Sequence, residues 1–280
     1  GRLVEAAVRR HAAVLNELAN RQDPNWRRLA GERECLLGNS NRAARVLADS
    51  RSFADYISLA ALHCGRGDAA GYQTTIERLP HFLNEQLAEE AERHYWQAVS
   101  LSLRSDPESE GIEEMMRLAK LAVDANPDHP RFKFAVGLAD FRGQQFEAAL
   151  DPLQESLKIP VQDVDDLTDH TLSWAVLAMT YHHLGRPDEA RDWLARCDQW
   201  RDLSTRRTIS AFQGNHRAGR GLGDHRWNVA NLLTRQAELL ISGAETVAEA
   251  EQQRRAKLAP LAEQNAASGS QTSQTGPGTE

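Results

Sequence analysis

The amino-acid sequence predicts an all-α protein, a helical-hairpin superhelix (α-solenoid) of about five hairpins with a C-terminal capping helix. One hairpin-sized pattern recurs along the chain, and small residues return at the same positions of each copy. Gly and Pro stand where one helix has to end and the next has to begin. An array of this kind needs no deep central core, because each hairpin buries only the faces that it shares with its neighbours. A 41% share of apolar residues suits such an array.

The clearest copy of the pattern begins at Thr171, and its spacing predicts two packed helices. Ala178 and Ala190 stand where the two helix backbones have to approach each other, and larger side chains fill the space around them. Gly185 is placed to end the first helix, and Pro187 is placed to begin the second. The other residues of this copy that match the pattern are Trp174, Leu177, Tyr181, Leu184, Leu194 and Cys197.

Earlier copies begin near residues 53, 96 and 130, and a weaker one precedes them. The step from 96 to 130 is 34 residues, whereas the step from 130 to 171 is 41 residues. We interpret the difference as an insertion of about seven residues within 161–170, a segment rich in Asp. The weaker copy is indicated by Trp26, Leu29, Ala30, Ala43, Ala44 and Leu47.

The repeats divide the chain into five segments. We expect a leading helix in 1–22, the repeat array in 23–200, a mobile loop rich in Arg and Gly in 201–225, capping and C-terminal helices in 226–262, and a disordered tail in 263–280. The tail is composed mainly of Ser, Gln, Thr, Gly and Pro, which cannot bury enough apolar surface to become ordered. The capping helix is expected to cover the last hairpin, as repeat arrays require.

Charge and hydropathy exclude two classes of partner. The net charge of −7 is spread along the chain with no run of Lys and Arg, so we expect no binding to nucleic acid. No stretch approaches 18 uninterrupted apolar residues, so we expect no insertion into a membrane. We expect a cytoplasmic protein, or one exposed outside the inner membrane if a longer parent protein is anchored there. The chain begins at Gly1 and not at Met, which suggests such a longer parent.

The sequence offers no set of residues suited to catalysis or to a metal. Three cysteines at wide spacing form neither a disulfide framework nor a metal knuckle. His182 and His183 are adjacent on a predicted helix and point about 100° apart, so the pair is poorly placed to share one ion. No Ser or Cys stands in a nucleophile motif, and the paired carboxylates fit solvated helix faces. We therefore expect no enzyme activity, no metal and no cofactor within this chain.

The residues from Leu177 to Leu194, LAMTYHHLGRPDEARDWL, resemble the tetratricopeptide-repeat tails of large bacterial multidomain proteins. The segments 67–72 and 118–127 resemble the same tails, and the likeness covers roughly residues 24–200. Such tails often follow a Ser/Thr protein kinase domain of eukaryotic type. The kinase signatures themselves are absent, since the chain has no glycine-rich loop over a strand, no His-Arg-Asp loop and no Asp-Phe-Gly.

The resemblance implies a binding groove on the concave face of the array, lined by fixed positions of each first helix. In the two best copies these positions are Arg131, Phe134, Leu138, Phe141, Leu172, Ala175, Met179 and His182. Most are apolar, so the Lys and Asn clamp with which some relatives hold a peptide carboxylate is absent. An apolar groove suits an amphipathic helix or an extended hydrophobic peptide. Equally, an added helix of the same chain could fill it.

We therefore predict a non-catalytic protein-protein interaction or scaffold module that binds a protein or peptide ligand in this groove. The alternative is the regulatory C-terminal tail of a bacterial Ser/Thr protein kinase whose catalytic domain lies outside this chain. A third alternative is a structural array that mediates self-association.

Overall fold

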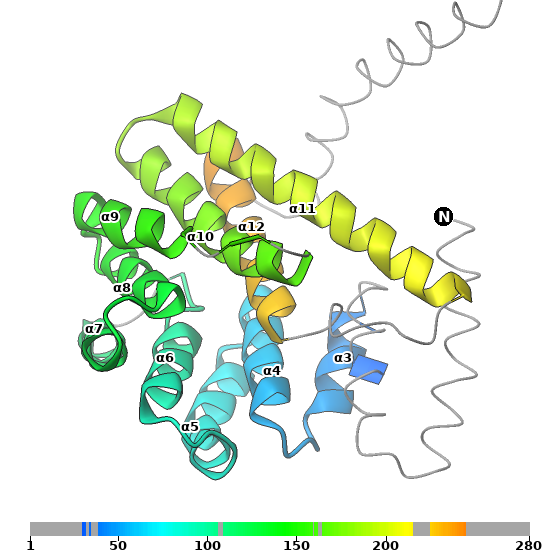
Figure 1. The fold of residues 1–280 in the computed structure, drawn as a ribbon. Coiled ribbons are helices and arrows are strands. Elements are labelled where there is room, and N and C mark those ends of the chain that lie inside the picture. The colour runs from blue at the N-terminus through cyan, green and yellow to red at the C-terminus, as the bar shows by residue number, and fades with distance from the viewer. Residues whose placement is uncertain are drawn as a thin grey trace, which may run out of the picture.

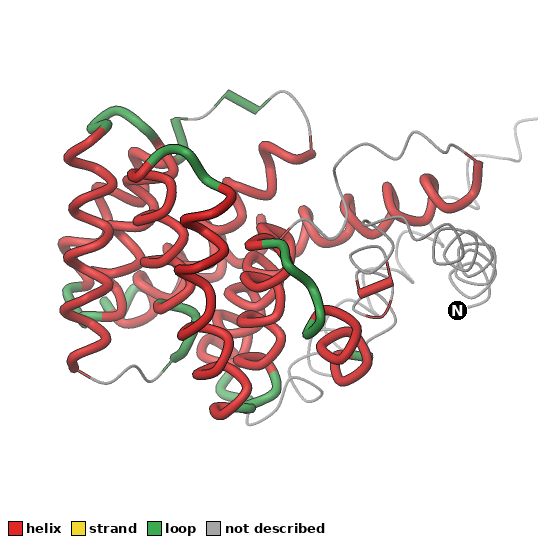
Figure 2. Tube along the Cα trace, turned by 90° about the horizontal axis from the view of Figure 1, so that it is seen from below, coloured by secondary structure: helices red, strands yellow, loops and turns green. Residues whose placement is uncertain are grey.

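The computed structural model describes residues 30–31, 34, 39–105, 109–158, 160–161, 164–214 and 225–244. This part of the chain contains ten helices, α3 to α12, and no strand, which confirms the prediction of an all-α protein (Figures 1 and 2). The leading helix expected in 1–22 and the tail expected in 263–280 lie outside the described residues. So do Trp26 and Leu29 of the weak first copy.

The described helices succeed one another with short connections. They are α3 (Ser40–Leu47), α4 (Phe53–Gly65), α5 (Ala69–Gln86), α6 (Glu90–Leu101), α7 (Ser109–Ala125), α8 (Pro130–Arg142), α9 (Phe146–Ser156), α10 (Val164–His183), α11 (Pro187–Gly214) and α12 (His225–Ser242). Among helices that are consecutive in the chain, the most extensive packing joins α4 to α5, α6 to α7, α8 to α9 and α10 to α11. Successive pairs touch through α5 and α6, α7 and α8, and α9 and α10. The first helices of successive pairs also contact each other, α4 with α6, α6 with α8 and α8 with α10.

Local sequence explains where these helices begin and end. Gly67 and Gly185, in the turns after α4 and α10, have φ angles of 67° and 70°, which side chains rarely allow. The carboxylate of Asp68 accepts a hydrogen bond from the Gly71 N–H at 3.0 Å and so caps the start of α5. Pro130 begins α8, where its fixed φ suits the first helical turn and its missing N–H is not needed.

Small residues allow the paired helices to approach closely, as their spacing predicts. Ala178 and Ala190 have no exposed surface, and both lie in the α10–α11 pair. In the α8–α9 pair, a Cβ atom built on Gly137 would lie only 2.5 Å from Cγ of Leu153. The backbone of α8 therefore rests directly on a side chain of α9.

Helix α11 differs from the expected loop. It has 28 residues and continues through 201–214, where the composition suggested a mobile Arg/Gly segment. The glycines of that segment come only at Gly214 and later, so nothing in 201–213 ends the helix. Packing also continues past the expected end at residue 200, because Ser204 is buried and Arg201 Nη2 donates to Glu238 Oε1 of α12 at 2.8 Å. Residues 215–224 lie outside the described part.

Helix α12 is the helical segment expected after residue 225, but it covers more than the last pair. It packs against α10 and α11 and also against α4, the first helix of the earliest complete pair in the described chain. In Figure 1, α12 is the orange helix between α10 and α4. Since α4 and α10 stand at opposite ends of the row of first helices, α12 joins the two ends of the row. The C-terminal part of the predicted 226–262 segment, after residue 244, is not described.

Candidate functional site

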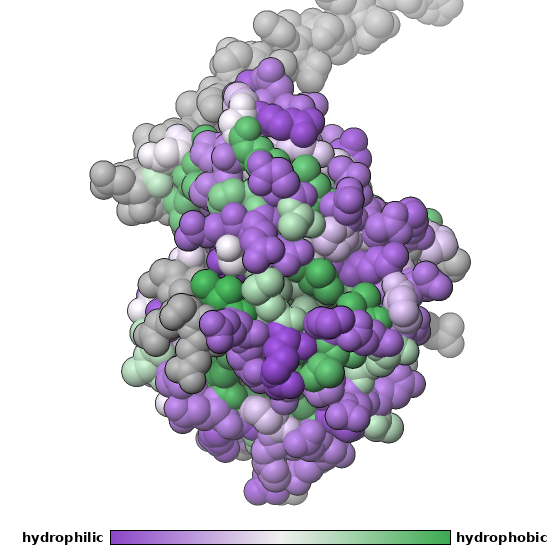
Figure 3. Space-filling model, turned by 90° about the vertical axis from the view of Figure 1, so that its left-hand side faces the viewer, coloured by the Kyte–Doolittle hydropathy of each residue, from purple (hydrophilic) through white to green (hydrophobic). Residues whose placement is uncertain are grey.

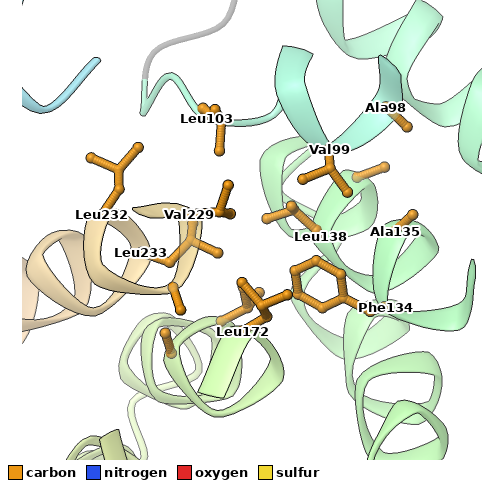
Figure 4. Close-up of a cluster of buried hydrophobic side chains, with 14 of the residues drawn as sticks. Ala98, Val99, Leu103, Phe134, Ala135, Leu138, Leu172, Val229, Leu232 and Leu233 are labelled. Atoms are coloured by element: carbon orange, nitrogen blue, oxygen red, sulfur yellow. The ribbon is translucent and has the colours of Figure 1, made fainter. Parts of the chain in front are cut away.

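The candidate site is the surface on which α12 lies. We call it the inner face and define it by five residues: Ser58 of α4, Leu103 just after α6, Leu138 of α8, and Asp169 and Leu172 of α10. Figure 4 shows Val229, Leu232 and Leu233 of α12 grouped with Val99, Leu103, Phe134, Leu138 and Leu172. All of these side chains are buried in one hydrophobic cluster. The apolar side of α12 therefore fills the space between the first helices.

The eight predicted groove residues lie on α8 and α10. The six apolar ones are at most 6% exposed: Phe134, Leu138, Phe141, Leu172, Ala175 and Met179. Arg131 and His182 are half-buried. Phe134, Leu138 and Leu172 of this set lie in one buried cluster with Val229, Leu232 and Leu233 of α12 (Figure 4). Binding of an external partner by these eight residues stays a prediction.

Asp169 anchors the first turn of α12. Its Oδ2 atom accepts hydrogen bonds from Arg131 Nε at 3.1 Å and Nη2 at 2.9 Å, and from Arg226 Nη1 of α12 at 3.1 Å. The side chain of Asp169 is only 4% exposed, so the two guanidinium groups supply the compensation that a buried carboxylate needs. Arg131, expected to contact a partner, instead shares this carboxylate with α12.

Two further polar contacts fix the register of α12 on the inner face. Asn228 Nδ2 donates to Ser58 Oγ at 3.0 Å, and both residues are buried. Near the other end, Gln236 Nε2 donates to the Leu103 carbonyl at 2.8 Å, and Arg142 Nη2 donates to Gln236 Oε1 at 2.6 Å. Buried hydrogen bonds of this kind penalise any sliding of the helix, because each lost bond would leave a buried polar group unpaired.

Aromatic rings close the site at the start of α12. The His225 ring lies 4.4 Å from the Trp96 ring and 5.5 Å from the Phe53 ring, both in edge-to-face geometry. The ring centroids of Trp227 and Trp200 lie 6.4 Å apart. On the side facing α11, Arg201 Nη2 donates to Glu238 Oε1 at 2.8 Å. α12 thus makes a side-chain hydrogen bond with each of the three helices that it packs against, α4, α10 and α11.

The polar groups beneath this end of α12 are held in fixed protonation states. Burial raises the pKa of the Tyr95 phenol, and the negative charge of Asp169 raises it further, so the hydroxyl stays protonated. Tyr95 Oη and Asp169 Oδ1 are both buried without a hydrogen-bond partner. Burial also raises the pKa of the Cys197 thiol to about 12. This sulfur therefore remains a neutral thiol and is a poor nucleophile.

A cavity of about 450 Å³ lies beside the C-terminal end of α12. Its wall includes Phe141, Phe146, Met179, His183 and Leu240. The Phe146 and His183 rings stack with their centroids 4.5 Å apart, and burial followed by the charge of His182 lowers the pKa of His183. Phe141 and Met179 are thus the two predicted groove residues that reach a hollow not filled by α12.

The face of the described chain that carries α7 and α9 is more hydrophilic than the inner face (Figure 3). Figure 3, which shows the side of the molecule that carries α7 and α9, is largely hydrophilic with separate apolar patches. Among the described residues, the large apolar side chains that are mainly exposed are Leu121, Val161 and Leu203. They lie on different helices or connections, so they do not form one docking surface.

No family model matches the sequence, and no curated protein matches it significantly. Within the described residues, no group of three or more His, Cys, Asp or Glu is arranged to hold a metal ion. None of the helices described above is long and apolar enough to cross a membrane.

Sequence reasoning missed the residues that anchor α12. Ser58, Arg142, Asp169 and Asn228 were not among the predicted site residues, because no short motif connects them. One signal did point to Asp169, since it belongs to the Asp-rich insertion that lengthens the step between the last two repeats. In the structure, residues 164–170 of this insertion form the first two turns of α10.

Proposed function

We propose that this chain is a non-catalytic protein-interaction or scaffold module with a tetratricopeptide-like α-solenoid architecture. The observation that carries the proposal is the order of helix packing. Each helix from α4 to α10 packs on the next helix in the chain, and the first helices of successive pairs stand side by side. Packing between neighbours is typical of repeat arrays, whose first helices together present a continuous surface for ligands.

The repeat positions support the same architecture. Ala60, Gly137 and Ala178 occupy the same position in three of the predicted copies, and all three are buried. A recurring small residue at one point of each pair is what a repeated hairpin needs, because larger side chains there would push the two helices apart.

The chemistry of the inner face favours a helical ligand. The face has a carboxylate near one end, branched apolar side chains in the middle, and a backbone carbonyl with a guanidinium group near the other end. An amphipathic helix can meet all three with residues spaced one turn apart. An extended peptide would leave its own backbone N–H and C=O groups unpaired against the apolar middle.

Selection of peptides on the intact protein tests the proposal. A displayed library of helical peptides is selected on the immobilised full chain, and enriched peptides are then titrated in solution. We expect saturable binding at micromolar concentration or better, with hydrogen exchange slowed in the first helices of the pairs. If no peptide binds the chain better than it binds an unrelated helical protein of similar charge, the interaction function is wrong.

A further inference from the structure

Helix α12 differs from the other described helices in what it packs against. The helices from α3 to α11 contact each other in chain order or between successive first helices, whereas Asn228 of α12 meets Ser58, 170 residues earlier. α12 runs in the same direction as α4, because His225 lies beside Phe53 at the start of α4 and Gln236 shares a cavity wall with Cys64 near its end. α12 thus packs between α4 and α10, the two ends of the row of first helices, and is not part of a further pair.

The contacts of α12 follow a simple linear pattern. Arg226 in the first turn meets Asp169, Val229, Leu232 and Leu233 enter the apolar middle, and Gln236 meets Arg142 and the Leu103 carbonyl. The apolar residues are three, six and seven positions after the arginine, which places them on one side of the helix. This is the arrangement by which an amphipathic helix binds in a groove.

Buried polar atoms lie without a hydrogen-bond partner near the first turn of α12. Asp169 Oδ1 is buried without a hydrogen-bond partner, because Arg131 and Arg226 both bind Oδ2. Trp227 Nε1, in the first turn of α12, is buried and unpaired as well. Unpaired buried polar atoms weaken an interface. A helix whose arginine reached both oxygens of Asp169 would form a bidentate pair, which is stronger than the hydrogen bond of Arg226 to Oδ2 alone.

We propose that α12 occupies a binding site for a partner, and that the inner face binds an amphipathic helix of another polypeptide in place of α12. The partner helix has the pattern of α12: an arginine in its first turn, branched apolar residues three, six and seven positions later, and a side-chain amide ten positions later. This inference rests on the proposed function, since it names the partner chemistry of the same module. α12 and the partner compete for one site.

The first test loosens α12 without changing the inner face. Arg226→Ala and Gln236→Ala are introduced together in the full chain; they remove the contacts of α12 with Asp169, Arg142 and the Leu103 carbonyl and favour helix formation. The probe is a fluorescent synthetic peptide with the sequence His225–Ser242, and binding is followed by anisotropy. The loosened chain should bind this peptide at least tenfold more tightly than the wild-type chain does. If circular dichroism shows that the double variant is unfolded, Arg226→Ala alone is used.

The second test holds α12 in place. Ser58→Cys and Asn228→Cys put two thiols where the Oγ and Nδ2 atoms now lie 3.0 Å apart, and a short thiol crosslinker joins them. The two single-cysteine variants, treated in the same way, are the matched controls. Binding of the peptide should be lost in the crosslinked chain and retained in both controls. A peptide with Glu in place of Arg226 should bind the loosened chain at least tenfold more weakly than the parent peptide.

Two results would overturn the proposal. One is equal binding of the peptide by the loosened and crosslinked chains, which would make α12 a permanent part of the core. The other is equal binding of the Arg and Glu peptides, which would remove the role of Asp169. If library peptides bind the crosslinked chain as well as the wild type, the interaction function stands, and its site is elsewhere. A failure of the proposed function would show instead as an absence of any selected peptide.

Discussion

Replacement of Gly137 by Ala tests whether the close approach of paired helices holds this fold together. Gly137 lies in the middle of α8, and an added Cβ would be 2.5 Å from Leu153 Cγ, 2.9 Å from Leu153 Cδ2 and 3.1 Å from the Ala149 carbonyl oxygen. Leu153 has no exposed surface, so it has no free space to move into. The α8 and α9 backbones would have to separate to relieve the contact.

Gly111 of α7 provides the matched control, because a Cβ there meets nothing within 4 Å. Either change of Gly to Ala within a helix gains about 1 kcal/mol from backbone propensity. Overpacking at Gly137 should cost about 1–3 kcal/mol. We therefore expect Gly111→Ala to stabilise the chain by up to about 1 kcal/mol, and the two variants to differ by about 1–3 kcal/mol. Whether Gly137→Ala raises or lowers the free energy of unfolding depends on how far α9 relaxes. The difference in free energy of unfolding between the two variants does not depend on helix propensity.

Urea unfolding followed by far-ultraviolet circular dichroism measures both free energies of unfolding. Thermal melts give an independent check, since 1 kcal/mol corresponds to about 2–4 °C for a domain of this size. Equal shifts in the two variants would refute the reasoning, because they would mean that α8 does not rest on Leu153. Such a result would also remove the physical basis for a small residue at this repeat position.

Three further predictions follow from the anchors and from α12. Ser58→Ala should lower the free energy of unfolding by about 1–3 kcal/mol, because it leaves the buried Asn228 amide unpaired, and a double-mutant cycle with Asn228→Ala should show a coupling of about 1 kcal/mol. Burial, and then the charge of Arg131, lower the pKa of His129 below the ordinary 6.5, while Glu89, Glu92 and Asp169 act in the opposite direction. The stability that neutral His129 contributes is therefore present above about pH 6.5 and is lost as the pH falls below that value. His129→Gln should consequently reduce the drop in melting temperature between about pH 7.5 and pH 5. Truncation after Gly214, which removes α12, should expose the apolar inner face and promote association detectable by light scattering; a truncated chain that stays monomeric and equally stable would contradict this.

The paired helices were predictable because their signals are local. A helix needs partners only four residues away, and a hairpin needs a break of a few residues between two apolar stripes. The structure places the start of α8 at Pro130 and the start of α4 at Phe53, where the sequence indicates new copies. The starts of α6 and α10 come earlier than the repeat count suggests, at Glu90 and Val164. In α6 the extra turn carries Glu90 and Glu92, and acidic residues there interact favourably with the helix N-terminus.

The arrangement of α12 could not be predicted in the same way. Its apolar residues indicate a helix, but they do not say which surface the helix covers, since the end of the last pair and the row of first helices are both apolar. The choice depends on contacts such as that of Asn228 with Ser58, which join residues 170 positions apart and have no period. From the sequence alone, a polar residue among apolar ones is interpreted as solvent-exposed, because its hydrogen-bond partner is not known.

The insertion predicted in 161–170 links the row of first helices to α12. Seven extra residues interrupt the repeat count, and in the structure they lengthen α10 by two turns at its N-terminal end. That extension carries Asp169 beyond the part of α10 that the repeat pattern requires. The carboxylate then stands where both Arg131 of the array and Arg226 of α12 reach it. Without the extension, the first turn of α12 would lose its contact with the Asp169 carboxylate. The N-terminal extension of α10 therefore helps to hold α12 on the inner face.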